Sequence, residues 1–286
     1  IQLYPKVTSP TQYRIPDEMT NEEYALVCAN EIEDAILEIG VKNVAGFVAE
    51  PIGGASTGAE VPHDVYFPRV QKICKQYNVP IILDEVLTGI GRTGKMFGYN
   101  HWNIDTDVIC LAKGLGAGYY PIGAIAAKNK YVQPVLDNGG FMHGFTYAGN
   151  PFGCAVGRAV LETIDEEKLV ENSKNQGGYL LQKIKALTEN YQWIGDVRGR
   201  GLLMAVEFAD KDTKQPFPNS WQVGEAVTKV AFDLGLIVYP KKSLNGISGD
   251  HLLVTPPLII TRKESKKLLN LLTQSFESYN KIIKSR

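Results

Sequence analysis

The sequence has few cysteines and few histidines, and no two cysteines stand in a CxxC spacing. The 286 residues include four of each, and Cys28, Cys74, Cys110 and Cys154 all lie among apolar neighbours. This pattern argues against a disulfide framework and against a zinc site. We therefore expect four buried, reduced thiols, no metal centre, and a reducing compartment such as the cytoplasm.

An excess of charge of one sign is also lacking, and so are long hydrophobic runs. The formal net charge is −1, so the charge balance does not predict binding to nucleic acid or to an anionic membrane. No apolar run is long enough to span a bilayer, and no signal peptide is recognisable. Hydrophobic residues make up 44% of the chain, which suffices for a globular core.

Apolar strands alternate with helices in roughly the first 165 residues. The patterns predict helices at 21–39, 66–78 and 150–164, and strands at 44–50, 79–85, 107–113 and 122–127. Strands that are apolar throughout are typical of a parallel sheet covered on both faces. We therefore predict an α/β fold with a mostly parallel sheet, whose large domain covers residues 1–164.

A smaller α+β domain is predicted over residues 165–286, including the helix that links it to the first. The helical patterns cover 167–189, 221–235 and a last helix from Thr261, while strands are expected within 194–208, at 236–239 and before Pro256. Because proline cannot donate a hydrogen bond to a neighbouring strand, we expect the strand before Pro256 to lie at a sheet edge.

Three predicted strands end at or beside a charged residue: Glu50, Asp84 and Lys113. In parallel sheets, ligands bind outside the carboxyl ends of the strands. A buried lysine keeps more of its free amine, which is a nucleophile toward aldehydes. A buried carboxylate needs a partner, and a protonated pyridine nitrogen would provide one. Two simpler interpretations stay open: Lys113 reaches solvent, and Asp84 caps the following turn.

Further residues near these strand ends, or in later turns of the sequence, are candidates for binding or structural roles. The stretch "HGFTYAGNP" (143–151) puts the Thr146 hydroxyl in a turn before a helix, where phosphate groups bind, although such a loop is also common without a ligand. Glycines at 114, 116 and 118 would let the backbone approach a bulky ligand. We interpret Glu85 as structural and paired with a basic residue, and Arg92 as fixing its loop.

These stretches together resemble the class III, or omega, aminotransferases, which are fold-type I pyridoxal-phosphate enzymes. The resemblance rests on "LDEVLTGIGRTGKMFGYNHWNIDTDVICLAKGLGAGYYPIGAI", "AEPIGG", "HGFTYAGNP" and "PPLIIT", and it runs over nearly the whole chain. It implies transfer of an amino group from an amine or ω-amino acid to a 2-oxo acid such as pyruvate. It also implies a homodimer with shared active sites.

The resemblance also implies roles for individual residues. Lys113 would bind the cofactor covalently and later carry a proton, and Asp84 would pair with the pyridine nitrogen. Val86 would pack on one face of the ring. Thr146 would reach the phosphate of the cofactor in the partner subunit, and Glu50 would lie near the substrate, where it can pair with an arginine.

The sequence departs from the family pattern in two ways. The Gly-Ser/Thr loop that cups the phosphate and the aromatic residue that stacks on the ring have no recognisable counterpart, so we expect the family's N-terminal third to be missing. We then expect weak cofactor binding by this chain alone and some uncovered sheet edge and apolar surface. Several family members place an arginine for the substrate carboxylate just before "PPL", but the stretch "GDHLLVTPPL" contains none. Arg198 and Arg200, in "VRGRG", are structural residues in the family pattern, so the substrate-carboxylate site stays unassigned.

Three alternatives remain at this level. The same fold and cofactor support aminomutase or decarboxylase chemistry, which also needs Lys113 and Asp84. A catalytically incomplete fragment would act only as a structural or dimerising module. A dinucleotide-binding loop is disfavoured, because "GLGAGY" follows a lysine and lacks the third glycine of that motif.

Overall fold

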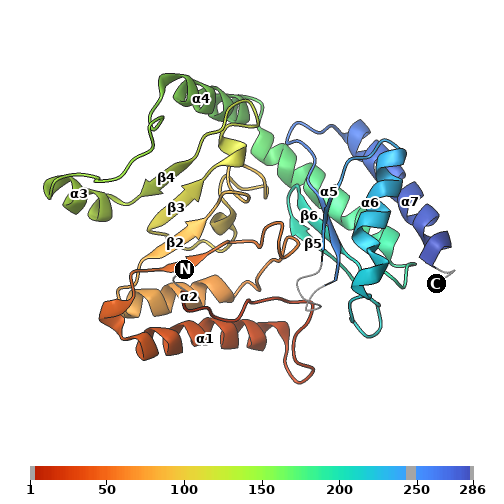
Figure 1. Cartoon of the computed structure of the whole chain (residues 1–286), viewed down its shortest axis with the longest axis horizontal. Coiled ribbons are helices and arrows are strands. Elements are labelled where there is room, and N and C mark those ends of the chain that lie inside the picture. The colour runs from red at the N-terminus through yellow and green to blue at the C-terminus, as the bar shows by residue number, and fades with distance from the viewer. Residues whose placement is uncertain (1–3, 243–248, 284–286) are drawn as a thin grey trace. The chain divides into compact units, whose positions relative to one another are not determined.

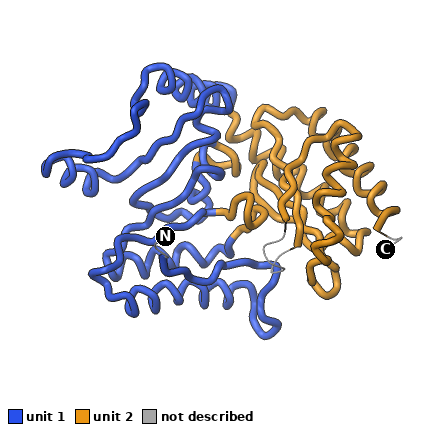
Figure 2. The backbone as a smooth tube through the Cα atoms, in the orientation of Figure 1, with its two compact units in different colours: residues 1–51, 62–90, 97–167 blue, residues 52–61, 91–96, 168–286 orange. Residues whose placement is uncertain are grey.

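The computed structural model describes residues 4–242 and 249–283, and these form two compact units (Figures 1 and 2). Unit 1 comprises residues 1–51, 62–90 and 97–167, and unit 2 comprises residues 52–61, 91–96 and 168–286. Two short segments of the first half of the chain thus belong to unit 2. The domain bounds expected from the sequence, 1–164 and 165–286, stay a prediction.

Unit 1 is built around a four-stranded sheet in the order β1-β2-β3-β4. Its strands are β1 (Phe47–Ala49), β2 (Ile81–Asp84), β3 (Val108–Leu111) and β4 (Ala124–Ala127). The first three are mutually parallel, as predicted, whereas β4 runs antiparallel to β3. A parallel partner needs a crossover connection, usually a helix, and the segment between β3 and β4 contains only the short 3-10 helix η3 (Lys113–Leu115).

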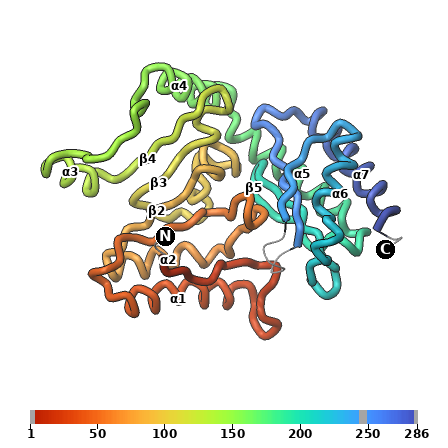
Figure 3. The backbone as a smooth tube through the Cα atoms, viewed as in Figure 1, coloured from red at the N-terminus to blue at the C-terminus, as the bar shows by residue number. Residues whose placement is uncertain are grey.

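Helices α1 (Asn21–Ile39) and α2 (Tyr66–Gln76) pack side by side in unit 1 (Figure 3). The sequence predicted α1 with both of its ends. Thr20 and Glu23 form the capping box, and Gly40 ends the helix with a φ of 85°. Helices α3 (Asn129–Asp137) and α4 (Pro151–Glu166) follow the sheet, and α3 was not predicted.

The two faces of this sheet differ in exposure. Ile81, Leu83 and Ile109 are buried on one face. On the other face Val48 is 65% exposed and Ile125 is 74% exposed. Parallel sheets are normally covered on both faces, so the exposed apolar side chains agree with the expected uncovered surface.

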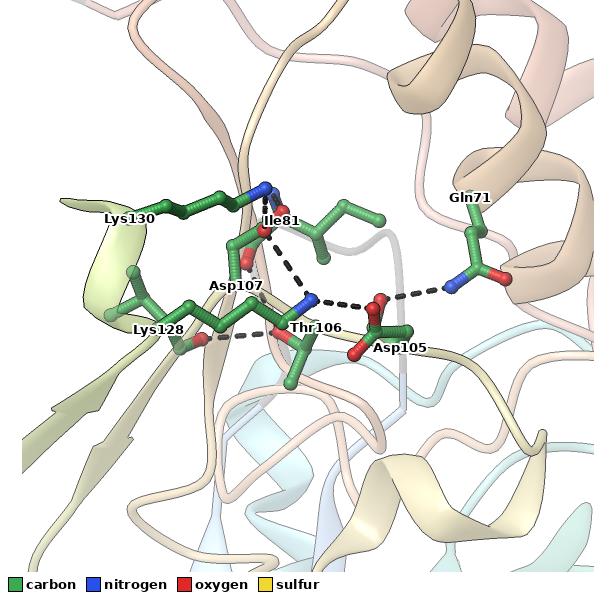
Figure 4. Close-up of polar contacts among 8 residues, drawn as sticks. Gln71, Ile81, Asp105, Thr106, Asp107, Lys128 and Lys130 are labelled. Atoms are coloured by element: carbon green, nitrogen blue, oxygen red, sulfur yellow. Dashed lines mark hydrogen bonds and ion pairs between the residues drawn. The ribbon is translucent and has the colours of Figure 1, made fainter.

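The amino ends of β2 and β3 are held by a cluster of paired charges, which we call the amino-end cluster (Figure 4). The Asp107 carboxylate accepts a hydrogen bond from the Ile81 N–H at 3.1 Å and pairs with the Lys130 ammonium at 2.8 Å. The Lys128 ammonium lies 2.5 Å from an Asp105 carboxylate oxygen and 3.5 Å from one of Asp107. These contacts fix the register in which the two strands start.

Unit 2 is the predicted α+β structure, with an antiparallel sheet in the order β5-β6-β8-β7. Its elements are α5 (Leu169–Thr188), β5 (Asp196–Arg200), β6 (Leu203–Glu207), α6 (Val223–Asp233), β7 (Tyr239–Lys241), β8 (His251–Val254) and α7 (Arg262–Ile283). All residues of β6 and β8 are buried. The core cluster includes Trp193, whose ring contacts those of Phe208 and Phe276.

Two expectations about buried and edge positions were wrong. Strand β8 lies between β6 and β7 rather than at an edge. It ends at Val254, before Thr255 and Pro256, so the proline removes no hydrogen-bond donor from the strand. All four cysteines are free, but Cys154 is exposed and Cys110 is only half-buried. Helix α4 buries the stripe that contains Gly153 and Gly157, and Cys154 lies off that stripe.

Candidate active site

Glu50, Asp84 and Lys113 follow or end three neighbouring parallel strands of unit 1. Ala49 pairs with Leu83 in the register of β1 and β2, so Glu50 and Asp84 are the next residues of their strands. Asp84 itself pairs with Cys110 of β3, and Lys113 begins η3 two residues after β3 ends. Two acids and one amine are therefore placed at the carboxyl edge of a single sheet, where α/β proteins bind ligands.

Asp84 lies on the exposed face of the sheet and is half-buried. Its Oδ1 atom accepts a hydrogen bond from the Val86 N–H at 2.9 Å, so the carboxylate does cap the following turn. Among the described residues its Oδ2 atom accepts no hydrogen bond. One oxygen thus fixes the orientation of the carboxylate, and the other can pair with a cationic group.

Lys113 is exposed, so the expected burial of its amine was wrong and the simpler interpretation, that the side chain reaches solvent, holds. Its backbone is strained. Its φ of 39° is positive, as in eight other non-glycine residues of the described chain, and L-residues other than asparagine and aspartate rarely adopt this left-handed region. Such strain is concentrated at functional sites. Within the described part of the chain no carboxylate lies at ion-pair distance from its ammonium group.

The glycines after Lys113 serve the fold of their own loop. A Cβ atom at Gly116 would lie 2.2 Å from the Tyr120 carbonyl oxygen, so only glycine fits there. Gly118 has a φ of 85°, which glycine adopts without strain. The turn between η3 and β4 thus requires glycine at 116 and favours it at 118, and the expected room for a ligand stays a prediction.

Val86 and Thr146 occupy positions compatible with the predicted roles. Val86 is half-buried directly after the two acids. Thr146 is exposed in a turn, closed by the hydrogen bond from the Ala148 N–H to the Phe145 carbonyl, just before α4. The described residues of this chain include no hydrogen bond from Thr146 to Asp84 or Lys113, so its role toward the cofactor stays a prediction.

Glu85 is structural, as predicted, but the expectation that it pairs with a basic residue was wrong. Its carboxylate accepts hydrogen bonds from the Thr88 hydroxyl and from the backbone N–H groups of Gly98 and Tyr99. The side chain is 1% exposed. Burial raises the pKa of Glu85, the three hydrogen bonds oppose this shift, and the negative charge of Asp84 adds to it.

The arginines that the sequence singled out are held within unit 2. Arg92 donates to the carbonyl oxygens of Leu202 and Pro256, and burial lowers its pKa to about 10, so it fixes its loop as predicted. Arg198 is surrounded by acids. Burial would lower its pKa, but the carboxylates of Glu60, Glu207 and Asp196 outweigh burial and raise it. Arg198 is therefore a structural residue; Arg200 is half-buried in the same strand.

Cys110 belongs to this edge of the sheet, and the sequence analysis did not single it out. It pairs with Asp84 in the strand register. Burial first, and the charge of Asp84 second, raise the pKa of its thiol, so the thiol stays protonated at neutral pH. Its position three residues before Lys113, at the end of an apolar strand, was the available signal.

A family model for class III aminotransferases matches residues 2–276. The chain belongs to the class III aminotransferase family. A similar curated relative is the uncharacterised aminotransferase YodT of Bacillus subtilis, at 35% identity over 99% of this chain and 64% of the relative. Another is the gamma aminobutyrate transaminase 2 of Solanum lycopersicum, at 34% identity over 94% of this chain and 58% of the relative.

Solved transaminase structures share the fold. The (S)-enantioselective omega-transaminase from Thermomicrobium roseum aligns with a TM-score of 0.88 at 34% identity, over 97% of this chain and 61% of that one. A transaminase from Virgibacillus aligns with a TM-score of 0.85 over 91% of this chain and 58% of that one. This class III aminotransferase chain thus spans less than two thirds of the length of these relatives.

Class III aminotransferases depend on pyridoxal phosphate, and the residues at the sheet edge fit that group in two respects. The uncommitted Oδ2 atom of Asp84 can accept from a protonated ring nitrogen. The exposed Lys113 amine, which has no ionic partner among the described residues, can react with an aldehyde. The half-buried Val86 supplies an apolar side chain next to Asp84.

The described residues offer no alternative metal centre. No group of three or more histidine, cysteine, aspartate or glutamate side chains within this part of the chain is arranged to hold a metal ion. None of its helices is long and apolar enough to cross a membrane.

Proposed function

We propose that this class III aminotransferase acts as a pyridoxal-phosphate-dependent transaminase that moves an amino group from an amine or ω-amino acid to a 2-oxo acid such as pyruvate. The observation that supports it is the placement of Asp84 and Lys113 at the carboxyl ends of adjacent parallel strands. The gamma-aminobutyrate and omega-transaminase relatives support an ω-amino acid or a primary amine as the donor.

When bound, pyridoxal phosphate supplies an electron sink for the bond that breaks at the substrate's α-carbon. Asp84 keeps a proton on the ring nitrogen through its Oδ2 atom, while the Val86 N–H holds its Oδ1 atom. Lys113 would hold the cofactor through Nζ, and its amine, once released, would carry the proton that leaves the substrate's α-carbon. Lys113 begins the short 3-10 helix η3, and its side chain is exposed.

The remaining residues orient the reactants in this proposal. Val86 packs against one face of the ring, and Glu50 faces the substrate, where it orients a positively charged group. Thr146 donates its hydroxyl hydrogen bond to the phosphate bound in a second copy of the chain. The protein is then a homodimer with shared sites, and its four free cysteines suit the reducing cytoplasm.

A turnover assay with a matched pair of variants tests this function. The protein with pyridoxal phosphate is supplied with γ-aminobutyrate or a primary amine together with pyruvate, and alanine formation is measured. Lys113→Ala should lower the rate by at least about 10²–10⁴-fold, the range expected for losing a proton-transfer group. Lys130→Ala, which alters a lysine of the amino-end cluster in the same unit, should leave the rate unchanged.

The products of the assay separate this function from its alternatives. Release of carbon dioxide, or movement of the amino group within one molecule, would replace transamination by decarboxylase or aminomutase chemistry. An absence of turnover with every donor would favour a catalytically incomplete module. Equal rates in the two lysine variants would contradict the role of Lys113.

A further inference from the structure

Strand β2 ends at Asp84 and Glu85 follows it directly, and these two adjacent acids have different surroundings. Successive residues of a strand point to opposite faces. Asp84 is half-buried on the exposed face, whereas Glu85 is 1% exposed. A buried carboxylate is stable only when its oxygens accept hydrogen bonds or pair with cations. Glu85 must therefore be held by specific donors.

The Glu85 side chain receives three hydrogen bonds from two chain segments. The Thr88 hydroxyl donates to Oε2 at 2.5 Å, and the Gly98 N–H donates to the same oxygen at 2.8 Å. The Tyr99 N–H donates to Oε1 at 2.9 Å. The carboxylate thereby joins the turn that follows β2 to the 3-10 helix η2 (Gly98–His101).

The backbone of Glu85 adds two further links. Its N–H donates to the Cys110 carbonyl of β3 at 3.0 Å, and its carbonyl accepts from the Gly89 N–H at 2.9 Å. Glu85 thus connects three segments: strand β3, the turn over residues 86–89, and η2. We call this set of contacts the Glu85 node.

The Glu85 node is closely packed against two glycines, Gly89 and Gly98. A Cβ atom at Gly89 would lie 2.7 Å from the Glu85 carbonyl oxygen. A Cβ atom at Gly98 would lie 2.9 Å from the Thr88 Cβ and 3.2 Å from Glu85 Oε2. Both positions need glycine because the turn and η2 press directly against the buried acid, so the carboxylate is held in one place.

The turn held by this node is the same turn that orients Asp84. The Val86 N–H, which fixes Asp84 Oδ1 at 2.9 Å, belongs to the segment that the Glu85 side chain and carbonyl close. We propose that Glu85 is a positioning residue: its buried carboxylate fixes Val86 and so sets the direction of the Asp84 carboxylate toward the ring nitrogen of the cofactor. This inference rests on the proposed function, because it needs Asp84 to face that ring.

Glu85→Ala and Glu85→Gln test the proposal in a graded way. The alanine removes all three acceptor contacts. The glutamine keeps one acceptor oxygen but turns an NH₂ group toward a backbone donor. Thr88→Val removes one contact only and serves as the variant that still folds if the others do not. Asp107→Asn in the amino-end cluster is the control that perturbs the same sheet at the opposite strand ends.

The first readout is amide hydrogen exchange of the protein without added cofactor. Glu85→Ala should speed exchange at residues 86–89 and 98–99 by at least about 10-fold, which corresponds to a local opening free energy lower by ~1.4 kcal/mol. Glu85→Gln and Thr88→Val should show smaller increases, and Asp107→Asn none at these amides. This readout does not depend on the proposed function.

The second readout is pyridoxal phosphate binding, followed by absorbance at several pH values. Glu85→Ala should weaken binding by at least 10-fold, on the order expected for losing a well-oriented charged contact, and should shift the pH dependence of the bound cofactor's absorbance. Asp107→Asn should alter neither. Faster exchange with unchanged affinity and pH dependence would make Glu85 purely structural and overturn the proposal.

A failure of the proposed function gives a different pattern of results. In that case Asp84→Asn and Lys113→Ala would also leave pyridoxal phosphate binding unchanged. If those two variants lose binding while Glu85→Ala and Thr88→Val keep it, the function stands and the positioning role of Glu85 is wrong.

Discussion

The two ends of the sheet in unit 1 carry similar residues in opposite circumstances. At the amino end, two lysines and two aspartates pair with one another, and Asp107 also accepts from a backbone N–H (Figure 4). At the carboxyl end, Asp84 has one hydrogen bond from its own turn, and Lys113 has no ionic partner among the described residues. The first group of charges holds strands in register, and the second is available to a ligand.

The comparison extends to the backbone. Lys113 has a φ of 39°, whereas the backbone that carries Lys128 is extended, with a φ of −64° and a ψ of 143°. The strained backbone of Lys113 and the half-buried Asp84 carboxylate, which has one hydrogen bond, both cost stability, and they occur together at the carboxyl end. We infer that this end is maintained for chemistry rather than for folding.

The largest expected difference between the two ends is in activity. Lys113→Gly should abolish turnover and leave stability unchanged or raised by up to about 1 kcal/mol. The gain comes from relief of ~1–2 kcal/mol of left-handed strain, offset in part by the entropy of unfolded glycine. Activity assays and urea denaturation measure both effects. Marked destabilisation with retained activity would mean that Lys113 serves folding rather than chemistry, which contradicts the assignment.

A substitution at the amino end should lower stability and leave activity unchanged. Asp107→Asn should lower the free energy of unfolding by about 1–3 kcal/mol, because a charge-assisted contact at a 14% exposed carboxylate is lost. The turnover rate per folded molecule should stay the same. Urea denaturation with a parallel assay checks this, and a lower rate in the folded variant would show that the two ends are coupled.

The lowered pKa of Asp107 predicts how the free energy of unfolding changes at acid pH. Burial alone would raise the pKa of Asp107, but the Lys130 ammonium, the Ile81 N–H and Lys128 outweigh burial and lower it. A carboxyl whose folded pKa lies below its unfolded value of about 3.9 stabilises the fold above that pH, and the contribution is lost as pH falls through the folded pKa. Urea denaturation across this acid range should show a shallower decline for Asp107→Asn than for the parent protein.

The smallest expected effect is at the exposed pair of the amino-end cluster. The Asp105 side chain is 69% exposed, so Asp105→Asn should change the free energy of unfolding by no more than about 1 kcal/mol. That small effect should shrink further at high salt, because solvent screens exposed charges. A larger, salt-insensitive loss would mean that Asp105 contributes as much as Asp107.

Local signals made part of this fold predictable. The capping boxes of α1 and α7, the apolar strands β1 to β3 and the charged residues at or just beyond their carboxyl ends can all be read from neighbouring residues. Helix α3 was missed because it is short and Pro134 lies inside it. The direction of β4 was also missed, because an apolar run such as "IGAIAA" is the same whichever way the strand points.

Contacts between distant segments limited the prediction of the site. The donors to Glu85 include Gly98 and Tyr99, which η2 brings to the end of β2, and no local pattern announces that approach. The interior place of β8 likewise depends on its pairing with β6 across more than forty residues of chain. Sequence could name Asp84 and Lys113 as a pair, but not the node that orients one of them.

The central claim is that Lys113, rather than another lysine of this sheet, binds the cofactor's aldehyde. Borohydride reduction of the protein with pyridoxal phosphate, followed by peptide mapping with mass spectrometry, tests this directly, because reduction makes the carbon–nitrogen bond permanent. The account predicts the added mass on Lys113, with labelling reduced in Asp84→Asn. Added mass on Lys128 or Lys130 in place of Lys113, or none at saturating cofactor, would contradict it.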